Sequence, residues 1–475
     1  MLFPTITFTI FFLLVFVASW TLMPHFRLWK WFMIAAGIVF YGWWEWRFVA
    51  LLVVMAAGNQ LLAVLIKGGR TAAARKGLLV AALIFDLGLL GWFKYYDFFA
   101  TSLDNALDLV GLGAPLPLLN IALPIGVSFL TFRMISYQVD VYRRTIVPAP
   151  ALDFFVYAAF FPYLLAGPIA RVSEFVPQLR EPRDPRRIDA GRAFFLIYAG
   201  LLKKMLIADY LATNLVDGVF TTPGQYSSLE TLVGIVGYSV QIYCDFSAYS
   251  DIAIGLALLL GFELPDNFNA PYTARTLQDF WRRWHITLSR WLRDYLYIPL
   301  GGSRKGARRA SINIMVTMLL GGLWHGAGWT FVVWGGLHGA GQAVGHSRRE
   351  GRKRRGLPEL PDNPLAVVRQ RLFTFGYVTF AWVFFRADSL GDAAEVIAQL
   401  FRGWGRVGPG VTGTILVVIA LGIGVQFVPQ RLWREVQAGF ARLGPALQGV
   451  GIALALFMLS VLGPEGPASF LYFRF

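Results

Sequence analysis

The sequence predicts an all-α membrane protein with about twelve bilayer crossings and additional re-entrant or interfacial helices. Of its 475 residues, 56% are hydrophobic and only 15% are charged, whereas about a quarter of the residues in an ordinary globular protein are charged. Apolar runs of about 20 residues, which is enough to cross a bilayer, recur along nearly the whole chain. Basic residues gather between these runs, as they do in cytoplasmic loops. We therefore predict one integral-membrane domain over residues 1–475 and no soluble domain.

The composition argues against several other classes of protein. A single cysteine, Cys244, allows neither an internal disulfide nor a cysteine-based metal cluster, and no carboxylates stand at ligand spacing from the histidines, so we expect no metal site. The net charge of +15 suits cytoplasmic loops that face anionic lipid, and we expect no nucleic-acid partner. The N-terminal run has no basic segment and no small-residue cleavage site, which favours a retained first span over a signal peptide.

The first part of the chain is expected to form five spans, with the N-terminus outside. Asp97, Asp104 and Asp108 are expected in an outer loop, because no basic residue accompanies them. Residues 154–170 are apolar but have basic residues on both flanks and contain two prolines, so a re-entrant or interfacial element is expected there. The five spans are predicted over residues 3–22, 31–46, 48–66, 78–93 and 121–141.

The second part begins with two spans, and the second of these carries Asp245 and Asp251. Two carboxylates cannot face lipid cheaply, so they should line the protein interior or a wet cavity. Residues 266–309 alternate aromatic and basic residues at helical spacing, as in helices lying at the cytoplasmic interface. An out-and-back run follows, and the C-terminus is expected outside. The spans of this part are predicted over residues 194–216, 231–261, 312–341 (two crossings), 373–385, 411–428 and 450–462.

The run 312–341 contains His325, and an ionisable residue at membrane depth is a candidate for function. Trp324 precedes this histidine and several glycines surround it, so backbone or substrate can approach its ring closely. The alternative is that the glycines serve helix packing and the histidine bonds to a neighbouring helix. His338 lies beyond the expected hairpin tip and is a weaker candidate, as are His346 and His25.

Four motifs together resemble the membrane-bound O-acyltransferase family, and most closely its bacterial alginate O-acetyltransferase branch. They read FSAYSD from Phe246, PDNFNAPY from Pro265, FWRRWHITLS from Phe280 and LWHG from Leu323. The resemblance covers nearly the whole chain and is dense between residues 240 and 345. It implies the fold of that family and a multi-pass protein of the bacterial inner membrane. It also implies that His325 is the catalytic histidine and His285 a second, motif-borne one.

The resemblance further implies an acyl thioester donor, acetyl-CoA or an acyl-carrier thioester, and no tightly bound cofactor. Arginines hold phosphate bidentately, so Arg282 and Arg283 beside His285 are expected to bind the donor. Alternatively, His285 snorkels to the surface beside Trp284. His325 would deprotonate an acceptor hydroxyl, and the oxyanion donor would be His285, Trp324 or a backbone N–H group. Predicted substrate-binding residues are Arg282, Arg283, Asp245, Trp324 and Ser289.

Residues 464–475 form an aromatic tail that the charge pattern places outside. Taken alone, such residues suit an interfacial anchor. The resemblance implies more, because a terminal F-x-Y-F-x-F pattern carries the acyl group on its tyrosine in this branch, and Tyr472 occupies that position. Tyr472 would then hand the acetyl group to an extracytoplasmic O-acetyltransferase partner, which acts on the polysaccharide.

Three alternatives remain open at this point. The acyl group or acceptor could differ, as in D-alanylation of teichoic acid or acetylation of peptidoglycan or cellulose. A transporter would also place carboxylates and glycines in its spans, but no two halves of this sequence correspond. A scaffold without catalytic activity would leave acetylation intact after His325→Ala.

Overall fold

The computed structural model is helical throughout the residues it describes, which are all except 114–116, 358–361, 406–407, 463–469 and 472–475. The predicted all-α class is therefore confirmed for these residues. The chain forms two compact units, each made from two stretches of sequence. The first unit is Met1–Ile188 with Leu256–Pro265, and the second is Asp189–Gly255 with Asp266–Phe475. The grouping of residues 1–475 into a single membrane domain stays a prediction.

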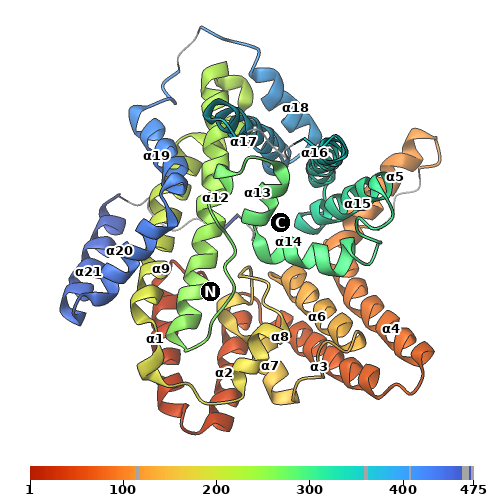
Figure 1. Ribbon diagram of the computed structural model, residues 1–475, viewed down its shortest axis with the longest axis vertical. Helices are drawn as coiled ribbons and strands as arrows, with labels where there is room; N and C mark the ends of the chain where they lie inside the picture. The colour runs from red at the N-terminus through yellow and green to blue at the C-terminus, as the bar shows by residue number, and fades with distance from the viewer. Residues whose placement is uncertain (114–116, 358–361, 406–407, 463–469, 472–475) are drawn as a thin grey trace. The chain divides into compact units, whose positions relative to one another are not determined.

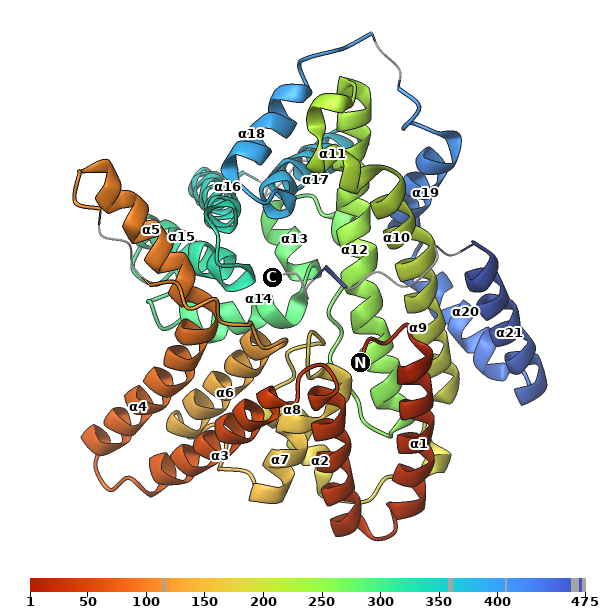
Figure 2. The ribbon, with the colours of Figure 1, turned by 180° about the vertical axis from the view of Figure 1, so that it is seen from behind.

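Helices that follow one another in the first unit pack as neighbours, α1 on α2 and α3 on α4, while α6 lies against α3 and α4 (Figure 2). Phe8, Phe40 and Phe161 meet between α1, α2 and a 3₁₀ turn, with ring centroids 5.6–6.4 Å apart. The helices are α1 (Ile6–Leu22), α2 (Phe26–Gly42), α3 (Arg47–Gly68), α4 (Ala72–Leu90) with the π-helical Gly91–Tyr95, α5 (Tyr96–Leu109), α6 (Val127–Tyr142), α7 (Ala151–Ala159) and α8 (Val172–Phe175), with 3₁₀ turns at Phe161–Tyr163, Val176–Leu179 and Pro185–Arg187.

One expected loop of the first unit is a helix. The residues after the predicted span 78–93 continue as α5, so Asp97, Asp104 and Asp108 are helical and the prediction of an outer loop there was wrong. Two features of this segment explain the helix: its apolar residues recur at helical spacing, and Asp97 stands in the first turn, where a carboxylate stabilises the helix dipole.

The predicted non-spanning element at 154–170 corresponds to a short, broken helix. Helix α7 has nine residues, which is about 13 Å of helix and far less than the 30 Å hydrocarbon thickness of a bilayer. The chain then continues through buried, mostly irregular backbone to Ala170. Lys30 on α2 forms an ion pair of 2.6 Å with Asp153 on α7 and ties the element down. Lys30 stands in the second turn of α2, which begins at Phe26.

In the second unit, α15 and α16 form a hairpin and α20 lies along α9 (Figure 1). The helices are α9 (Ala190–Leu202) with the π-helical Lys203–Ala208, α10 (Asp209–Leu211) with the π-helical Ala212–Val216, α11 (Asp217–Thr221), α12 (Ser228–Leu259), α13 (Leu277–Arg283), α14 (Ile286–Leu292) with the π-helical Arg293–Tyr297, α15 (Ala307–His325), α16 (Trp329–Arg354), α17 (Pro364–Arg386), α18 (Leu390–Gln399), α19 (Gly413–Gly424), α20 (Gln430–Arg442) and α21 (Pro445–Leu462), with 3₁₀ turns at Pro223–Gln225, Pro271–Thr273 and Val425–Phe427.

The predicted hairpin at 312–341 is present, with its tip at residues 326–328. Helix α16 runs on to Arg354, so Arg352, Lys353 and Arg354 lie in its last turn, where cations favour the helix dipole. Helices α18 and α20 were not predicted. Helix α20 alternates charged and apolar residues, and its Trp433 packs against Phe195 of α9 at 6.2 Å between ring centroids. Such a helix is too polar to stand out as an apolar run.

Within the described residues, three helical stretches are long and apolar enough to cross a membrane: Arg47–Gly68, Ala72–Leu109 and Ser228–Leu259. The bent pair Gly413–Phe427 and Arg431–Arg442, which turns by 96°, would be a fourth if it counts as one span. In α12, 94% of the most apolar stretch is buried inside the protein, which explains how this helix can carry carboxylates.

The α15–α16 hairpin depends on Gly322 and Gly335, which face each other where the two helices touch. A Cβ atom on Gly335 would collide with the carbonyl oxygen of Met318, and one on Gly322 with that of Phe331. The interpretation that glycines here serve helix packing is therefore confirmed for Gly322.

We expect Gly335→Val to destabilise the protein by about 1–3 kcal/mol, because the added atoms force the two helices apart. Gly345→Val, on the same helix but with open space around the added Cβ, is the matched control. Thermal unfolding of both variants in detergent measures the difference. Equal midpoints would contradict the packing role of Gly335.

Candidate active site

Three histidines and two tryptophans form a continuous row of rings inside the second unit. In order they are His285, Trp324, His325, Trp334 and His338, with successive ring centroids 6.2, 4.9, 5.0 and 4.8 Å apart. All five are buried. The segment between α13 and α14, the end of α15 and the middle of α16 supply them. The structure thus brings together His325 and His285, which the sequence singled out, and adds His338; we call these five rings the histidine row.

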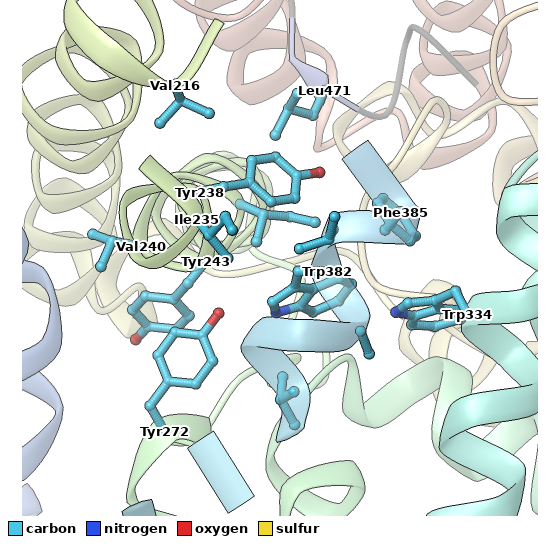
Figure 3. Packing of buried hydrophobic residues seen from close by; sticks show 14 of the residues in the cluster. Val216, Ile235, Tyr238, Val240, Tyr243, Tyr272, Trp334, Trp382, Phe385 and Leu471 are labelled. Atoms are coloured by element: carbon cyan, nitrogen blue, oxygen red, sulfur yellow. The ribbon is translucent and has the colours of Figure 1, made fainter. Parts of the chain in front are cut away.

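His325 is the last residue of α15 and lies in an aromatic box. The helix ends because Gly326 is extended, at φ −158°, and a Cβ there would collide with the Phe331 ring. Trp324, Trp334 and Phe385 surround the imidazole, the last at 5.2 Å between centroids (Figure 3 shows Trp334 and Phe385). Only 5% of His325 is exposed, so the box keeps bulk water from its ring.

His285 precedes α14 in the left-handed conformation, at φ +42°, which is uncommon for a non-glycine residue. Its Nδ1 lies 3.0 Å from Oδ1 of Asn267, and the same oxygen accepts the backbone N–H of Thr287 at 3.3 Å. Because a backbone N–H can only donate, this amide atom is the oxygen, and Nδ1 of His285 must carry the proton. The basic nitrogen of His285 is therefore Nε2.

His285 is fully buried, so the snorkelling alternative is wrong. Burial lowers the pKa of His285 to about 3, because a low-dielectric surrounding disfavours the charged form. The ring is neutral at physiological pH and contributes no positive charge to the binding of a phosphate.

The predicted donor-binding residues differ from His285 in their exposure. Arg282 is exposed, and Arg283 is partly buried and forms an ion pair of 2.9 Å with Asp279. Ser289 donates its hydroxyl to the carbonyl oxygen of Trp284 at 3.3 Å. A phosphate group of a donor would therefore contact the exposed Arg282 first, because Asp279 partly neutralises the charge of Arg283.

Asp245, predicted from its place in a span, belongs to a buried ion triad. Lys204 lies 2.6 Å from Asp245 and 2.7 Å from Asp209, and all three side chains are at most 3% exposed. Sequence reasoning missed Lys204 and Asp209, although two charged residues inside the predicted span 194–216 were a usable signal. Asp251 pairs with Lys203 at 2.6 Å in a less buried position.

His338 was given little weight because it lies across the hairpin tip from His325. Packing of α16 on α15 returns it to the site, where the Trp281 indole N–H donates to its Nδ1 at 3.2 Å. In the neutral ring the proton is then on Nε2. The sequence contained one indication that His338 lies near His325: Trp334 stands one helical turn before His338, so their side chains share one face of the helix.

Two residues of the C-terminal tail, Phe470 and Leu471, are described, and both are buried in the second unit. Phe470 and Leu471 are 1% and 4% exposed, and Leu471 packs in the cluster that contains Trp382 and Phe385 (Figure 3). Tyr472 lies outside the described residues. Within the described residues, no group of three His, Cys, Asp or Glu side chains is arranged to hold a metal ion.

Comparison with known proteins identifies the family. Residues 38–354 match the model of the membrane-bound O-acyltransferase family. This chain belongs to that family. The match contains the whole histidine row, and membership makes the protein a membrane O-acyltransferase, which settles the choice between an enzyme and a transporter.

Three relatives show the range of this family. The chain is 40% identical to a probable alginate O-acetylase, AlgI, of Pseudomonas putida, over 78% of this chain and 74% of the relative. It is 36% identical to a peptidoglycan O-acetyltransferase of Helicobacter pylori, over 78% and 73% of the two chains. It is 26% identical to a teichoic acid D-alanyltransferase of Streptococcus thermophilus, over 55% and 68%.

Proposed function

We propose that this O-acyltransferase moves an acetyl group from a cytoplasmic thioester across the membrane, toward O-acetylation of an exported polysaccharide such as alginate. The donor is acetyl-CoA or an acyl-carrier thioester, and the protein lies in the bacterial inner membrane with about twelve crossings. The observation that carries the proposal is the pair of buried histidines, His325 and His285, on either side of Trp324. The 40% identity to an alginate O-acetylase favours acetyl and alginate.

In the proposed reaction, His325 acts as the general base. It takes the proton of the acceptor hydroxyl, whose oxygen attacks the thioester carbonyl carbon, and the tetrahedral intermediate then breaks its C–S bond. The imidazolium returns the proton to the departing thiolate, so the histidine is regenerated. The aromatic box around His325 serves this step by limiting the access of water, so that hydrolysis of the thioester stays a slow side reaction.

The protonation state of His285 narrows the choice of oxyanion donor. Its one N–H is directed at Asn267, so the second ring nitrogen, Nε2, offers a lone pair and not a proton. Trp324 Nε1–H and backbone N–H groups are then the remaining candidates for stabilising the oxyanion. We assign His285 the role of accepting a hydrogen bond that orients the reacting hydroxyl or thiol.

Tyr472 is the proposed acceptor of the acetyl group and carries it to an extracytoplasmic O-acetyltransferase. The support is the terminal pattern of aromatic residues, together with the burial of Phe470 and Leu471 directly before it in the second unit. The polysaccharide then needs no access to the histidine row.

Peptidoglycan is the second candidate acceptor, because a peptidoglycan O-acetyltransferase is 36% identical over 78% of this chain. D-Alanine as the acyl group has weaker support, since the teichoic acid D-alanyltransferase match covers 55% of the chain. Both candidates keep the same histidine chemistry and differ in the acyl group or the final acceptor.

Purified protein in detergent, given radiolabelled acetyl-CoA, an acetyl-carrier thioester or a D-alanyl-carrier thioester, tests the donor. We expect label to be released or transferred from an acetyl thioester, and not from the D-alanyl one. The control is His25→Ala, which removes an exposed histidine outside the matched family region. Turnover of the D-alanyl thioester alone would reject acetyl transfer.

A further inference from the structure

We infer that Asp245, held by Lys204, is a docking site for the C-terminal tail and positions the tail for acyl transfer. The positioning role rests on the proposed function, in which the tail carries the acetyl group. The docking itself rests only on contacts within the second unit.

The tail is recognised through its backbone and through one ring. Leu471 donates its backbone N–H to Oδ2 of Asp245 at 2.9 Å. The Lys204 ammonium lies 4.8 Å from the centre of the Phe470 ring, and Tyr249 packs edge-on against the same ring at 4.9 Å. A carboxylate that accepts a backbone N–H makes a stronger hydrogen bond than a neutral acceptor does.

The charges of the triad suit this docking. Lys204 is shared by Asp209 and Asp245, so two carboxylates face a single ammonium in a buried place. A buried carboxylate needs additional donors to offset its lost hydration. Asp209 and Asp245 compete for the same ammonium, and Asp245 gains the N–H of Leu471. Lys204 stands in a π-helical segment, a feature that often marks a functional position in a helix.

The docked residue directly precedes the proposed acyl carrier. Adjacent Cα atoms are about 3.8 Å apart, so anchoring Leu471 lowers the entropy that the following residue must lose to reach a reactive geometry. Restricting a reacting group in this way accelerates a transfer step without any contact between Asp245 and the acyl group. Asp245 is therefore a positioning residue.

The experiment compares Asp245→Asn with Asp209→Asn in the full-length protein. Both variants remove one carboxylate from Lys204 and change the charge equally, but only the first weakens the acceptor of the Leu471 N–H. Purified protein is digested with carboxypeptidase Y, and the masses of the shortened chains are measured over time by mass spectrometry. We expect Leu471 and Phe470 to be released equally slowly from the wild type and from Asp209→Asn. In Asp245→Asn, we expect digestion to continue past Phe470 at least about tenfold faster, as for the loss of a charge-assisted hydrogen bond.

A second pair keeps the inference testable if Asp245→Asn does not fold. Leu471→Pro removes the N–H donor and leaves the triad intact, whereas Leu471→Ala keeps the donor. We expect faster digestion past residue 470 only in the proline variant. Equal digestion of Asp245→Asn and Asp209→Asn, or of the two Leu471 variants, would overturn the docking site.

Acetyl transfer in the same variants separates docking from the proposed function. We expect Asp245→Asn to lower polymer acetylation while thioester hydrolysis continues, a split that mere loss of folded protein would not produce. If digestion of Asp245→Asn is faster but its polymer acetylation is unchanged, the positioning role and the acyl-carrying tail are both rejected. The docking site would then still be supported.

Discussion

Replacing His325 by alanine is expected to lower acetyl transfer by about 100- to 10,000-fold, the usual contribution of a general base. No other base in the histidine row is placed to substitute. His285 is a weak base, because burial lowers its pKa to about 3, and His338 lies on the far side of Trp334. The measurement is the initial rate of acetyl transfer from the thioester by purified protein.

The control for this loss is His346→Ala, which removes a partly exposed histidine of α16 outside the row. His325→Gln tests whether the loss comes from chemistry or from an unfilled space in the aromatic box, because glutamine keeps most of the volume but is not a base at neutral pH. Thermal unfolding of each variant checks the fold. A folded His325→Gln protein with wild-type turnover would exclude His325 as the base.

Replacing Tyr472 by phenylalanine is expected to reduce polymer acetylation to background while thioester hydrolysis persists. The change removes one oxygen and keeps the ring, so the docking of Leu471 and Phe470 should be unaffected. In wild-type protein the acetyl label should appear on the C-terminal peptide as a hydroxylamine-sensitive ester.

Two observations would count against this relay. One is retained polymer acetylation in cells that produce only the Tyr472→Phe protein. The other is acetyl label on a peptide elsewhere in the chain. A useful comparison is Tyr226→Phe, which removes the hydroxyl of a partly buried tyrosine on the second unit and should leave acetylation intact.

Local patterns predicted those elements whose signal is confined to neighbouring residues. The long apolar runs of α3 and α12 were predicted within a few residues, because each is a continuous stretch of one character. For the hairpin of α15 and α16 the tip was predicted closely, but α16 runs on to Arg354, beyond the predicted end at residue 341. Helix α20 was missed for the opposite reason: it has few apolar residues, and its contact with α9 depends on a segment more than 200 residues earlier in the chain. Helix α5 was taken as a loop because its aspartates suggested an exposed connection.

The sequence also indicated His325, since an imidazole beside tryptophan in an apolar run is conspicuous by itself. It did not indicate the role of Asn267, which lies 18 residues before His285 and assigns that ring its proton. Nor could it pair Lys204 with Asp245, because 41 residues separate them. Each of these contacts requires two segments distant in the chain to meet, and the local pattern of one segment carries no information about its neighbour.

Composition and motif order alone were enough to establish a helical membrane protein of the O-acyltransferase family with His325 as the leading candidate. The tertiary structure alone decided that three histidines share one row, that His285 is neutral with its proton on Nδ1, and that the tail returns to Asp245. The physical reason is that hydrophobicity and local spacing are properties of a segment. Burial, protonation and ion pairing depend instead on which distant side chains fill the space around a group.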